Sequence, residues 1–143
     1  MKNAKQLLQE KLRPGIFAVP PDATVFQALQ LMAEKDIGAL LVMENDILLG
    51  IFSERDYARK VVLQGKTSAA TPIRDIMTAK VVFAKPESSI DECMALMSER
   101  RIRHLPVMSG TSVVGVLSIT DLVRAQIAEQ QFVIEQLEHY IHG

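Results

Sequence analysis

The chain has little cysteine, no tryptophan, and no excess of either charge. Cys93 is the only cysteine among 143 residues, which excludes an intramolecular disulfide and a thiolate cage for a metal ion. The 16 Lys and Arg residues are balanced by 17 Asp and Glu residues, without the basic excess that is typical of nucleic-acid binders. No apolar run approaches the ~18 residues of a membrane span, and the stretch MKNAKQLLQEKL lacks the apolar centre of a signal peptide. We expect a cytoplasmic protein that binds neither nucleic acid nor membrane.

Common catalytic motifs are absent as well. The sequence contains no G-x-S-x-G, no P-loop and no G-x-G-x-x-G. Its three histidines, His104, His139 and His142, include no His-x-x-x-His pair. These absences predict no metal site and no catalytic residues. A small hydrolase would need a nucleophile and base that the sequence does not offer.

An internal repeat organises what is present. Shifted by 65 positions, the sequence aligns with itself without a gap, and the matching pairs include Pro21/Pro86, Met32/Met97, Gly50/Gly115, Ser53/Ser118 and Asp56/Asp121. A lead-in before each copy, residues 6–12 and 71–77, matches too. A fixed offset over this length indicates two copies of one structural unit.

Each copy has the same order of expected elements. A short extended piece (17–19 or 81–83) precedes a capped helix with apolar residues at helical spacing. Two apolar strands joined by a turn follow (39–43 and 47–52, or 105–108 and 112–117), and a second helix begins near Ser53 or Ser118. The prediction is an α/β (α+β) fold of two β-α-β-β-α repeats, residues 6–63 and 71–125, packed with pseudo-twofold symmetry. An N-terminal helix and a C-terminal helix (126–143) flank the repeats.

The stretch GIFSERD, which ends at Asp56, recurs as GVLSITD, which ends at Asp121. Each places Ser and Asp three residues apart at a helix start, which is the spacing of a capping box and favours a purely local role. However, a helix N-terminus also attracts phosphate through its free N–H groups and dipole. A hydroxyl and a carboxylate at that place could serve phosphate and ribose, so both interpretations stand.

The doubled motif, the Ile102-Arg-His-Leu-Pro-Val107 stretch and the Ile73-Arg-Asp-Ile-Met77 lead-in together resemble a tandem pair of CBS (cystathionine beta-synthase) domains, a stand-alone Bateman-type module. The similarity covers about residues 6–125. It implies two clefts between the repeats, each able to bind an adenine nucleotide such as AMP, ADP, ATP or NAD(H), and frequent pairing into homodimers.

The resemblance also implies which residues bind. Asp121 and Asp56 would hold ribose hydroxyls, one in each cleft. The residues near phosphate would be Ser118 and Thr120 in one cleft and Ser53 and Arg55 in the other, with Arg103 and His104 as basic contacts. The opposite repeat would frame adenine with Phe17, Ile37 and Gly38 toward Asp121, and with Val82 and Ile102 toward Asp56. The first repeat has Gly38-Ala39 where the second has Arg103-His104, so the two clefts are unequal.

Two functions remain open at this point. One is a non-catalytic regulatory module with an adenine nucleotide as its bound effector. The other is a structural interaction module with empty clefts, whose apolar terminal helices dock a client enzyme or transporter. In the tail, Ile127, Ile134 and Ile141 recur every seven residues, which indicates an apolar face that needs a partner surface and favours a homodimer.

Overall fold

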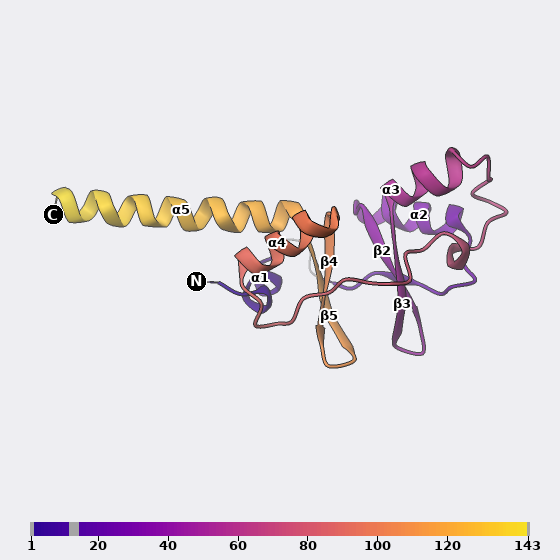
Figure 1. The fold of residues 1–143 in the computed structure, drawn as a ribbon, viewed down its shortest axis with the longest axis horizontal. Helices are drawn as coiled ribbons and strands as arrows, with labels where there is room; N and C mark the ends of the chain where they lie inside the picture. Colours follow the sequence, from indigo (N-terminus) through magenta and orange to yellow (C-terminus); the bar gives the residue numbers. More distant parts are fainter. Residues whose placement is uncertain (1, 12–14, 143) are drawn as a thin grey trace. The chain divides into compact units, whose positions relative to one another are not determined.

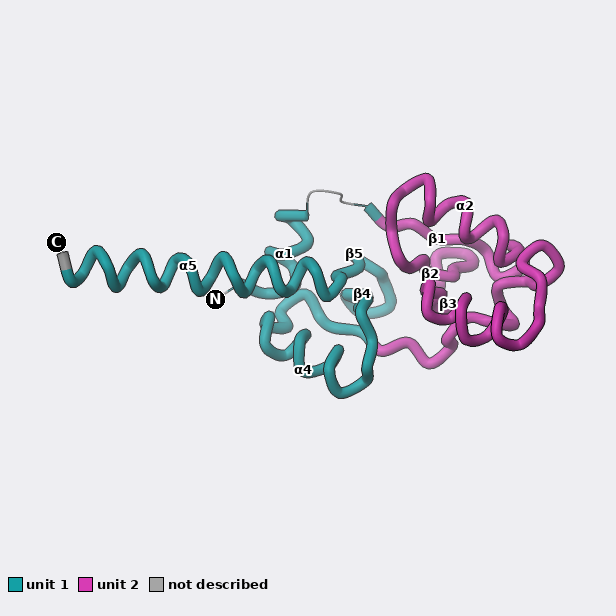
Figure 2. The backbone as a smooth tube through the Cα atoms, turned by 90° about the horizontal axis from the view of Figure 1, so that it is seen from above, with its two compact units in different colours: residues 1–15, 83–143 teal, residues 16–82 magenta. Residues whose placement is uncertain are grey.

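The computed structural model describes residues 2–11 and 15–142 (Figure 1). Its contacts divide the chain into two compact units, one of residues 1–15 with 83–143 and the other of residues 16–82 (Figure 2). Each unit contains a β-hairpin followed by a helix, so the mixed α/β architecture predicted from the repeat is confirmed.

The unit formed by the two ends of the chain contains the second repeat. Its elements are α1 (Ala4–Glu10), α4 (Ile90–Arg100), β4 (His104–Ser109), β5 (Ser112–Ser118) and α5 (Ile119–His142). Strands β4 and β5 pair antiparallel through a turn at Gly110, whose positive φ of 62° suits a residue without Cβ. The extended piece predicted at 81–83 is not a strand. It is reduced to one parallel bridge from Ala84 to Val107 beside the hairpin.

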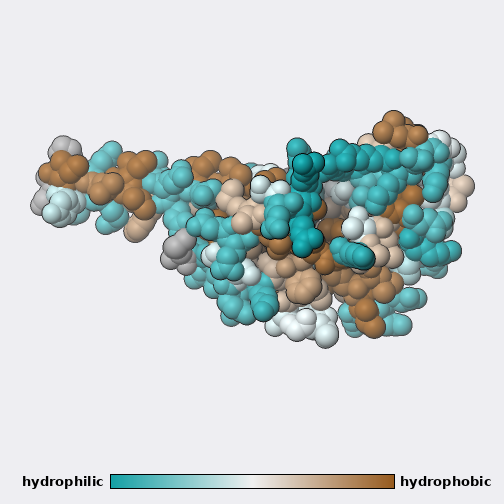
Figure 3. Space-filling view, viewed as in Figure 1, coloured by the Kyte–Doolittle hydropathy of each residue, from teal (hydrophilic) through white to brown (hydrophobic). Residues whose placement is uncertain are grey.

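Helix α5 is longer than either helix expected here. The predicted second helix of the repeat and the predicted C-terminal helix form one unbroken helix of 24 residues. Leu122 and Ala125 near its start are buried, whereas every side chain from Gln130 to Ile141 is exposed. Hydrophobic residues recur along this helix in the space-filling view (Figure 3).

The other unit contains the first repeat, with β1 (Ala18–Val19), α2 (Val25–Lys35), β2 (Ala39–Glu44), β3 (Ile47–Ser53), α3 (Glu54–Asp56), the π-helical η1 (Tyr57–Val62) and the 3₁₀ turn η2 (Ile73–Asp75). Strand β1 adds parallel to the antiparallel β2–β3 pair. Asn45 and Asp46 both have positive φ, 52° and 64°, as a two-residue hairpin turn of the primed type requires.

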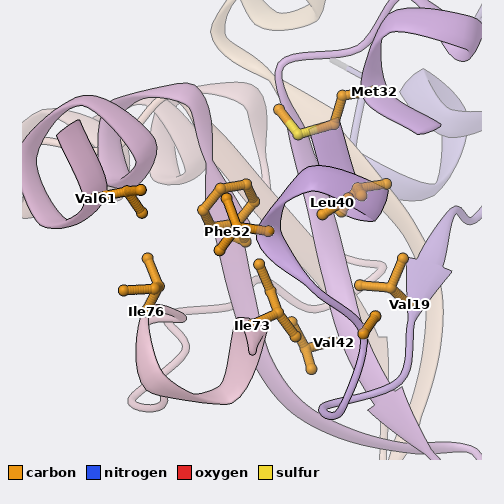
Figure 4. Close-up of a cluster of buried hydrophobic side chains, with 11 residues drawn as sticks. Val19, Met32, Leu40, Val42, Phe52, Val61, Ile73 and Ile76 are labelled. Atoms are coloured by element: carbon orange, nitrogen blue, oxygen red, sulfur yellow. The ribbon is translucent and has the colours of Figure 1, made fainter. Parts of the chain in front are cut away.

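The core of this unit lies between the sheet, helix α2, η1 and the η2 turn. Side chains from all four converge in Figure 4, with Phe52 and Val42 from the sheet, Met32 from α2, Val61 from η1 and Ile73 from η2. Thr24 begins α2 with a capping box to Gln27, and Ser89 caps α4 in the other repeat, at the predicted helix starts.

The lead-in segments do not stay with the repeats that they precede in sequence. Helix α1 packs on β5 of the second repeat, where Leu8 fills the space beside Gly115. The η2 turn packs on the first repeat, and Thr78 pairs with Ile51 of β3. The second-repeat unit is therefore completed by a segment from before the first repeat, whereas the first-repeat unit is one continuous stretch that ends with the lead-in of the second repeat.

Candidate functional site

The corner between β5 and α5 carries the second copy of the Ser-x-x-Asp motif. The Asp121 amide donates to Ser118 Oγ at 3.2 Å, and the Ser118 amide donates to Asp121 Oδ2 at 2.8 Å. This reciprocal pair is a capping box, so the local role predicted for the motif is confirmed. The same bonds fix the Asp121 carboxylate at the first turn of α5.

A lysine from the other end of the chain occupies this corner. Lys11 Nζ lies 3.3 Å from Asp121 Oδ2 and donates to the Val116 carbonyl at 2.8 Å. The two charged side chains retain only 21% and 18% of their exposure. A half-buried pair of this kind interacts more strongly than a surface pair, because less water screens it.

The first repeat builds a comparable corner with a different lysine. The Ser53 amide donates to Asp56 Oδ2 at 3.0 Å, and the Asp56 amide donates to Ser53 Oγ at 3.2 Å. Lys60 Nζ lies 3.2 Å from Asp56 Oδ1 and donates to the Ile76 carbonyl at 3.1 Å. Each aspartate is thus held by a serine amide and paired with an ammonium that also binds a nearby carbonyl.

His104 borders the second corner because β4 and β5 pair it with Ser118. Burial lowers the pKa of His104 below its ordinary value of 6.5, and the nearby Lys11 and Arg103 lower it further, whereas Asp121 opposes them. The imidazole is therefore neutral at pH 7 and offers one N–H donor instead of a positive charge. In the first repeat Ala39 lies opposite Ser53, so that corner has no imidazole.

Other predicted residues of the second repeat lie near the same corner. The Arg103 carbonyl accepts from the Ile119 amide at 2.8 Å, and the Arg103 side chain is exposed. Thr120 is exposed in the first turn of α5, and Ile102 is half-buried just before β4. These three residues share one compact unit with Ser118 and Asp121.

The remaining predicted residues belong to the unit of the first repeat. The Gly38 carbonyl accepts from the Glu54 amide at 3.1 Å, beside Arg55 in the corner of its own repeat. Phe17 and Ile37 pack against the core, and Lys35 Nζ lies 5.5 Å from the centre of the Phe17 ring. Val82 is half-buried at the end of this unit. The placement of Phe17, Ile37 and Gly38 toward Asp121, and of Ile102 toward Asp56, stays a prediction.

Sequence reasoning missed both lysines. Lys60 follows Asp56 by four residues, and this spacing on a helix is a recognisable ion-pair signal. Lys11 gave no such signal, because 110 residues separate it from Asp121 and only packing of α1 on β5 brings them together. The repeat alignment also hides the correspondence, since Ala125 stands at the position of Lys60.

Among residues 2–11 and 15–142, no group of three or more His, Cys, Asp or Glu side chains is arranged to hold a metal ion. No helix there is both long and apolar enough to cross a membrane. Cys93 is buried in α4, and burial together with the neighbouring Glu92 raises the pKa of its thiol.

Several known proteins resemble this chain over most of its length. CBSX3, a mitochondrial CBS domain-containing protein of Arabidopsis thaliana, is 40% identical over 127 residues, which cover 85% of this chain and 62% of CBSX3. The chain therefore spans less than two thirds of that relative. YhcV of Bacillus subtilis is 28% identical over 86% of this chain and 87% of its own length. A solved structure with CBS domains from Burkholderia ambifaria is 51% identical, with a TM-score of 0.86 over 90% of this chain and 96% of that one.

Two other solved structures share the fold. A hexameric CBS-CP12 protein from bloom-forming cyanobacteria is 28% identical, with a TM-score of 0.74 over 85% of this chain and 70% of its own. The CBS domain pair of MJ0100, 23% identical with a TM-score of 0.79 over 90% of this chain and 98% of its own, was solved in complex with 5′-methylthioadenosine and S-adenosyl-L-methionine. Assembly of this chain as a homodimer stays a prediction.

The CBS-domain family profile matches residues 6–63 and 73–128. Proteins of this family are generally regulatory and not catalytic, and a pair of CBS domains is a regulatory module. With both repeats matched and both corners built alike, the chain belongs to the CBS-domain family and carries two CBS domains in tandem.

Proposed function

We propose that the chain is a regulatory module that binds an adenine nucleotide (AMP, ADP, ATP or NAD(H)) at the corner of Ser118 and Asp121, and a second one at the corner of Ser53 and Asp56. One observation carries this proposal. In both repeats a half-buried aspartate is held by a serine amide and paired with a lysine within 3.3 Å. The two lysines come from unrelated segments, so repetition of sequence alone does not explain the shared arrangement.

The chemistry of each corner suits a ribose phosphate. A carboxylate accepts hydrogen bonds from two ribose hydroxyls, and such charge-assisted bonds are stronger than neutral ones. The lysine ammonium and the free N–H groups of the first helical turn favour a phosphate nearby. On binding, ribose hydroxyls would replace Lys11 at Asp121, which would leave Lys11 available to the phosphate.

The two corners should differ in affinity. The second-repeat corner has a long regular helix, the neutral His104 and the exposed Arg103 beside it. The first-repeat corner begins only a three-residue helix that continues as a π-helix, and it has Ala39 in place of the histidine. We expect the Asp121 corner to bind more tightly.

A related structure supports the ligand class. The CBS pair of MJ0100 holds two adenosine compounds, which shows that this fold can accept an adenosine group. The ligand of the present chain would be distinguished from S-adenosyl-L-methionine by charge, because Lys11 and Arg103 repel a sulfonium and attract a phosphate. A cytoplasmic location and a client enzyme or transporter stay predictions, and CBSX3 is described as mitochondrial.

Isothermal titration with AMP, ADP, ATP, NAD⁺, NADH and unphosphorylated adenosine tests the proposal. We expect at least one nucleotide to bind more tightly than adenosine, and Asp121→Ala to weaken that binding by about 1–3 kcal/mol through lost charge-assisted bonds. Asp91→Ala is the matched control, because Asp91 is also in the first turn of a helix but lies in α4. It should bind like the unchanged protein.

Asp56→Ala separates the two corners in the same titration and should remove only the weaker binding event. Urea unfolding of each variant shows whether loss of the capping box, which costs about 0.5–2 kcal/mol, has impaired folding. The proposal fails if no adenine compound at millimolar concentration binds the folded protein. It also fails if neither aspartate variant changes binding. An interaction module with empty clefts would bind no adenine compound, and its purified protein would carry no nucleotide absorbance near 260 nm.

A further inference from the structure

The C-terminal half of α5 is an exposed helix with little charge. Six of its twelve residues from Gln130 to Ile141 are large and apolar, and all six are exposed, from 48% at Ile134 to 85% at Tyr140. Only Glu135 and Glu138 carry full charges there. An isolated helix of this length is marginal in water, and hydrophobic side chains in Figure 3 continue to its end. This part of α5 therefore needs a packing partner.

The apolar residues follow a heptad pattern. Ile127, Ile134 and Ile141 occupy one core position (a), and Val123, Gln130 and Leu137 occupy the other (d). We call these six residues the α5 seam. Its five apolar members are exposed by 41–72%, while the buried Leu122 and Ala125 place the contact with the rest of the unit on another side of the helix. All five apolar side chains of the seam are therefore accessible in the folded chain.

The seam can pair with a reversed copy of itself, with apolar residues facing each other in two of the three distinct pairs and Gln130 facing Ile134 in the third. When a second α5 is laid antiparallel and centred on residue 132, Val123 meets Ile141 of the second copy, Ile127 meets Leu137, and Gln130 meets Ile134. All six seam positions are then paired, and the twofold symmetry makes each of the three pairs occur twice in the dimer. A symmetric contact of this kind buries the same surface on both copies and closes without forming a chain of molecules.

Charges flanking the seam favour the antiparallel direction. In that arrangement the same flanking positions of the two helices face each other, so Arg124 lies across from Glu138 of the second copy, and this occurs twice. Val133 meets its own counterpart at the centre. A parallel pair would instead place Val133 across from Glu138, and Arg124 would then have no acidic residue of the second copy across from it. We propose that α5 is an interaction surface for a second copy of this chain, bound as an antiparallel two-helix coil centred on residue 132.

Sedimentation of the full chain with single substitutions tests the surface. Ile134→Glu places a charge in the centre of the seam twice per dimer, and we expect it to raise the dissociation constant by on the order of 100-fold. Phe132→Glu is the matched control, because Phe132 is equally apolar and 60% exposed on the same helix but lies off the seam. It should leave the dimer intact. A monomeric unchanged protein, or equal effects of the two variants, would overturn the proposal.

Charge exchange tests the direction. Arg124→Glu and Glu138→Arg should each weaken the dimer several-fold, and the double variant should restore it, because each changed residue meets the other across the antiparallel pair. Introduced cysteines provide a second measurement, since the native Cys93 is buried and should not react. Val133→Cys should cross-link the two copies and Ile134→Cys should not. Cross-linking through Ile134→Cys with no rescue by charge exchange would show a parallel pair and overturn the assignment.

Discussion

At the scale of single residues, His104 makes the stability of the folded chain depend on pH at the corner between β5 and α5. Its neutral form is favoured in the folded chain by burial first and by Lys11 second, against the attraction of Asp121. The unfolded chain lacks these neighbours and titrates near 6.5. The folded protein thus resists a proton that the unfolded protein accepts. The stability that His104 contributes is fully present above pH 6.5 and is lost as the pH falls from 6.5 through the folded pKa.

We predict that Lys11→Met raises the pKa of His104 toward its ordinary value, because the change removes a positive neighbour. The pKa should stay below that value, because the burial of His104 remains. NMR titration of the imidazole protons measures both forms directly. Lys66→Met, a change of an exposed lysine in the other unit, should leave the pKa unchanged. A His104 that titrates at or above 6.5 in the unchanged protein would contradict the prediction.

The residues of the corners were predictable to different degrees. Ser53, Asp56, Ser118 and Asp121 follow from a short motif whose capping bonds are local, and the structure makes those bonds. Lys11 could not be predicted, since its ion pair depends on how α1 packs on β5. The sequence predicts contacts between side chains within about four residues of each other well. It predicts contacts with a distant segment poorly, because those depend on tertiary packing.

At the scale of elements, the strands and first helices of both repeats follow from periodicity, whereas two features do not. The extended piece at 81–83 has strand-like residues, but only Ala84 pairs with the hairpin. The second helices begin with the same motif yet differ, since one becomes the π-helical η1 and the other the long α5. Both features depend on tertiary packing, which overrides local preference.

Gly50 and Gly115 hold equivalent places where a lead-in segment packs on a strand. A Cβ at Gly115 would lie 2.6 Å from Cδ2 of Leu8, the end of a flexible side chain. A Cβ at Gly50 would meet Met77 Sδ at 2.6 Å and also the Thr78 backbone oxygen at 2.9 Å. We predict that both Gly→Ala changes lower the free energy of unfolding by about 1–3 kcal/mol, and that Gly50→Ala costs more because backbone cannot move aside.

Urea unfolding of double variants checks the cause of these losses. Leu8→Ala should relieve most of the additional cost of Gly115→Ala, because it removes the atoms in collision. Met77→Ala should relieve only part of the cost of Gly50→Ala, because the Thr78 oxygen stays. Each coupling is measured as the departure of the double variant from additivity. Full relief by Met77→Ala would show that the backbone contact does not determine the cost.

At the scale of the whole molecule, the chain is less modular than its repeat implies. The two sequence copies follow one another, yet each compact unit contains the lead-in that precedes the other repeat, and the second-repeat unit takes its lead-in from the opposite end of the chain. Helix α1 contributes the buried Ala4 and Leu7 to the second-repeat unit and also supplies the lysine near Asp121. The fold class was predictable because the repeat fixes the order of elements. The packing of each lead-in segment on the other repeat was not predictable, because both lead-ins have the same residue pattern.

Self-association through α5 makes a further prediction about unfolding of the whole chain. A dimer dissociates when its chains unfold, so its thermal midpoint rises with protein concentration by mass action. We expect this rise for the unchanged protein and for Phe132→Glu, and no rise for Ile134→Glu. Calorimetry over a hundredfold range of concentration measures it. A midpoint of the unchanged protein that stays constant over this range would show that the α5 seam contributes nothing to stability at these concentrations.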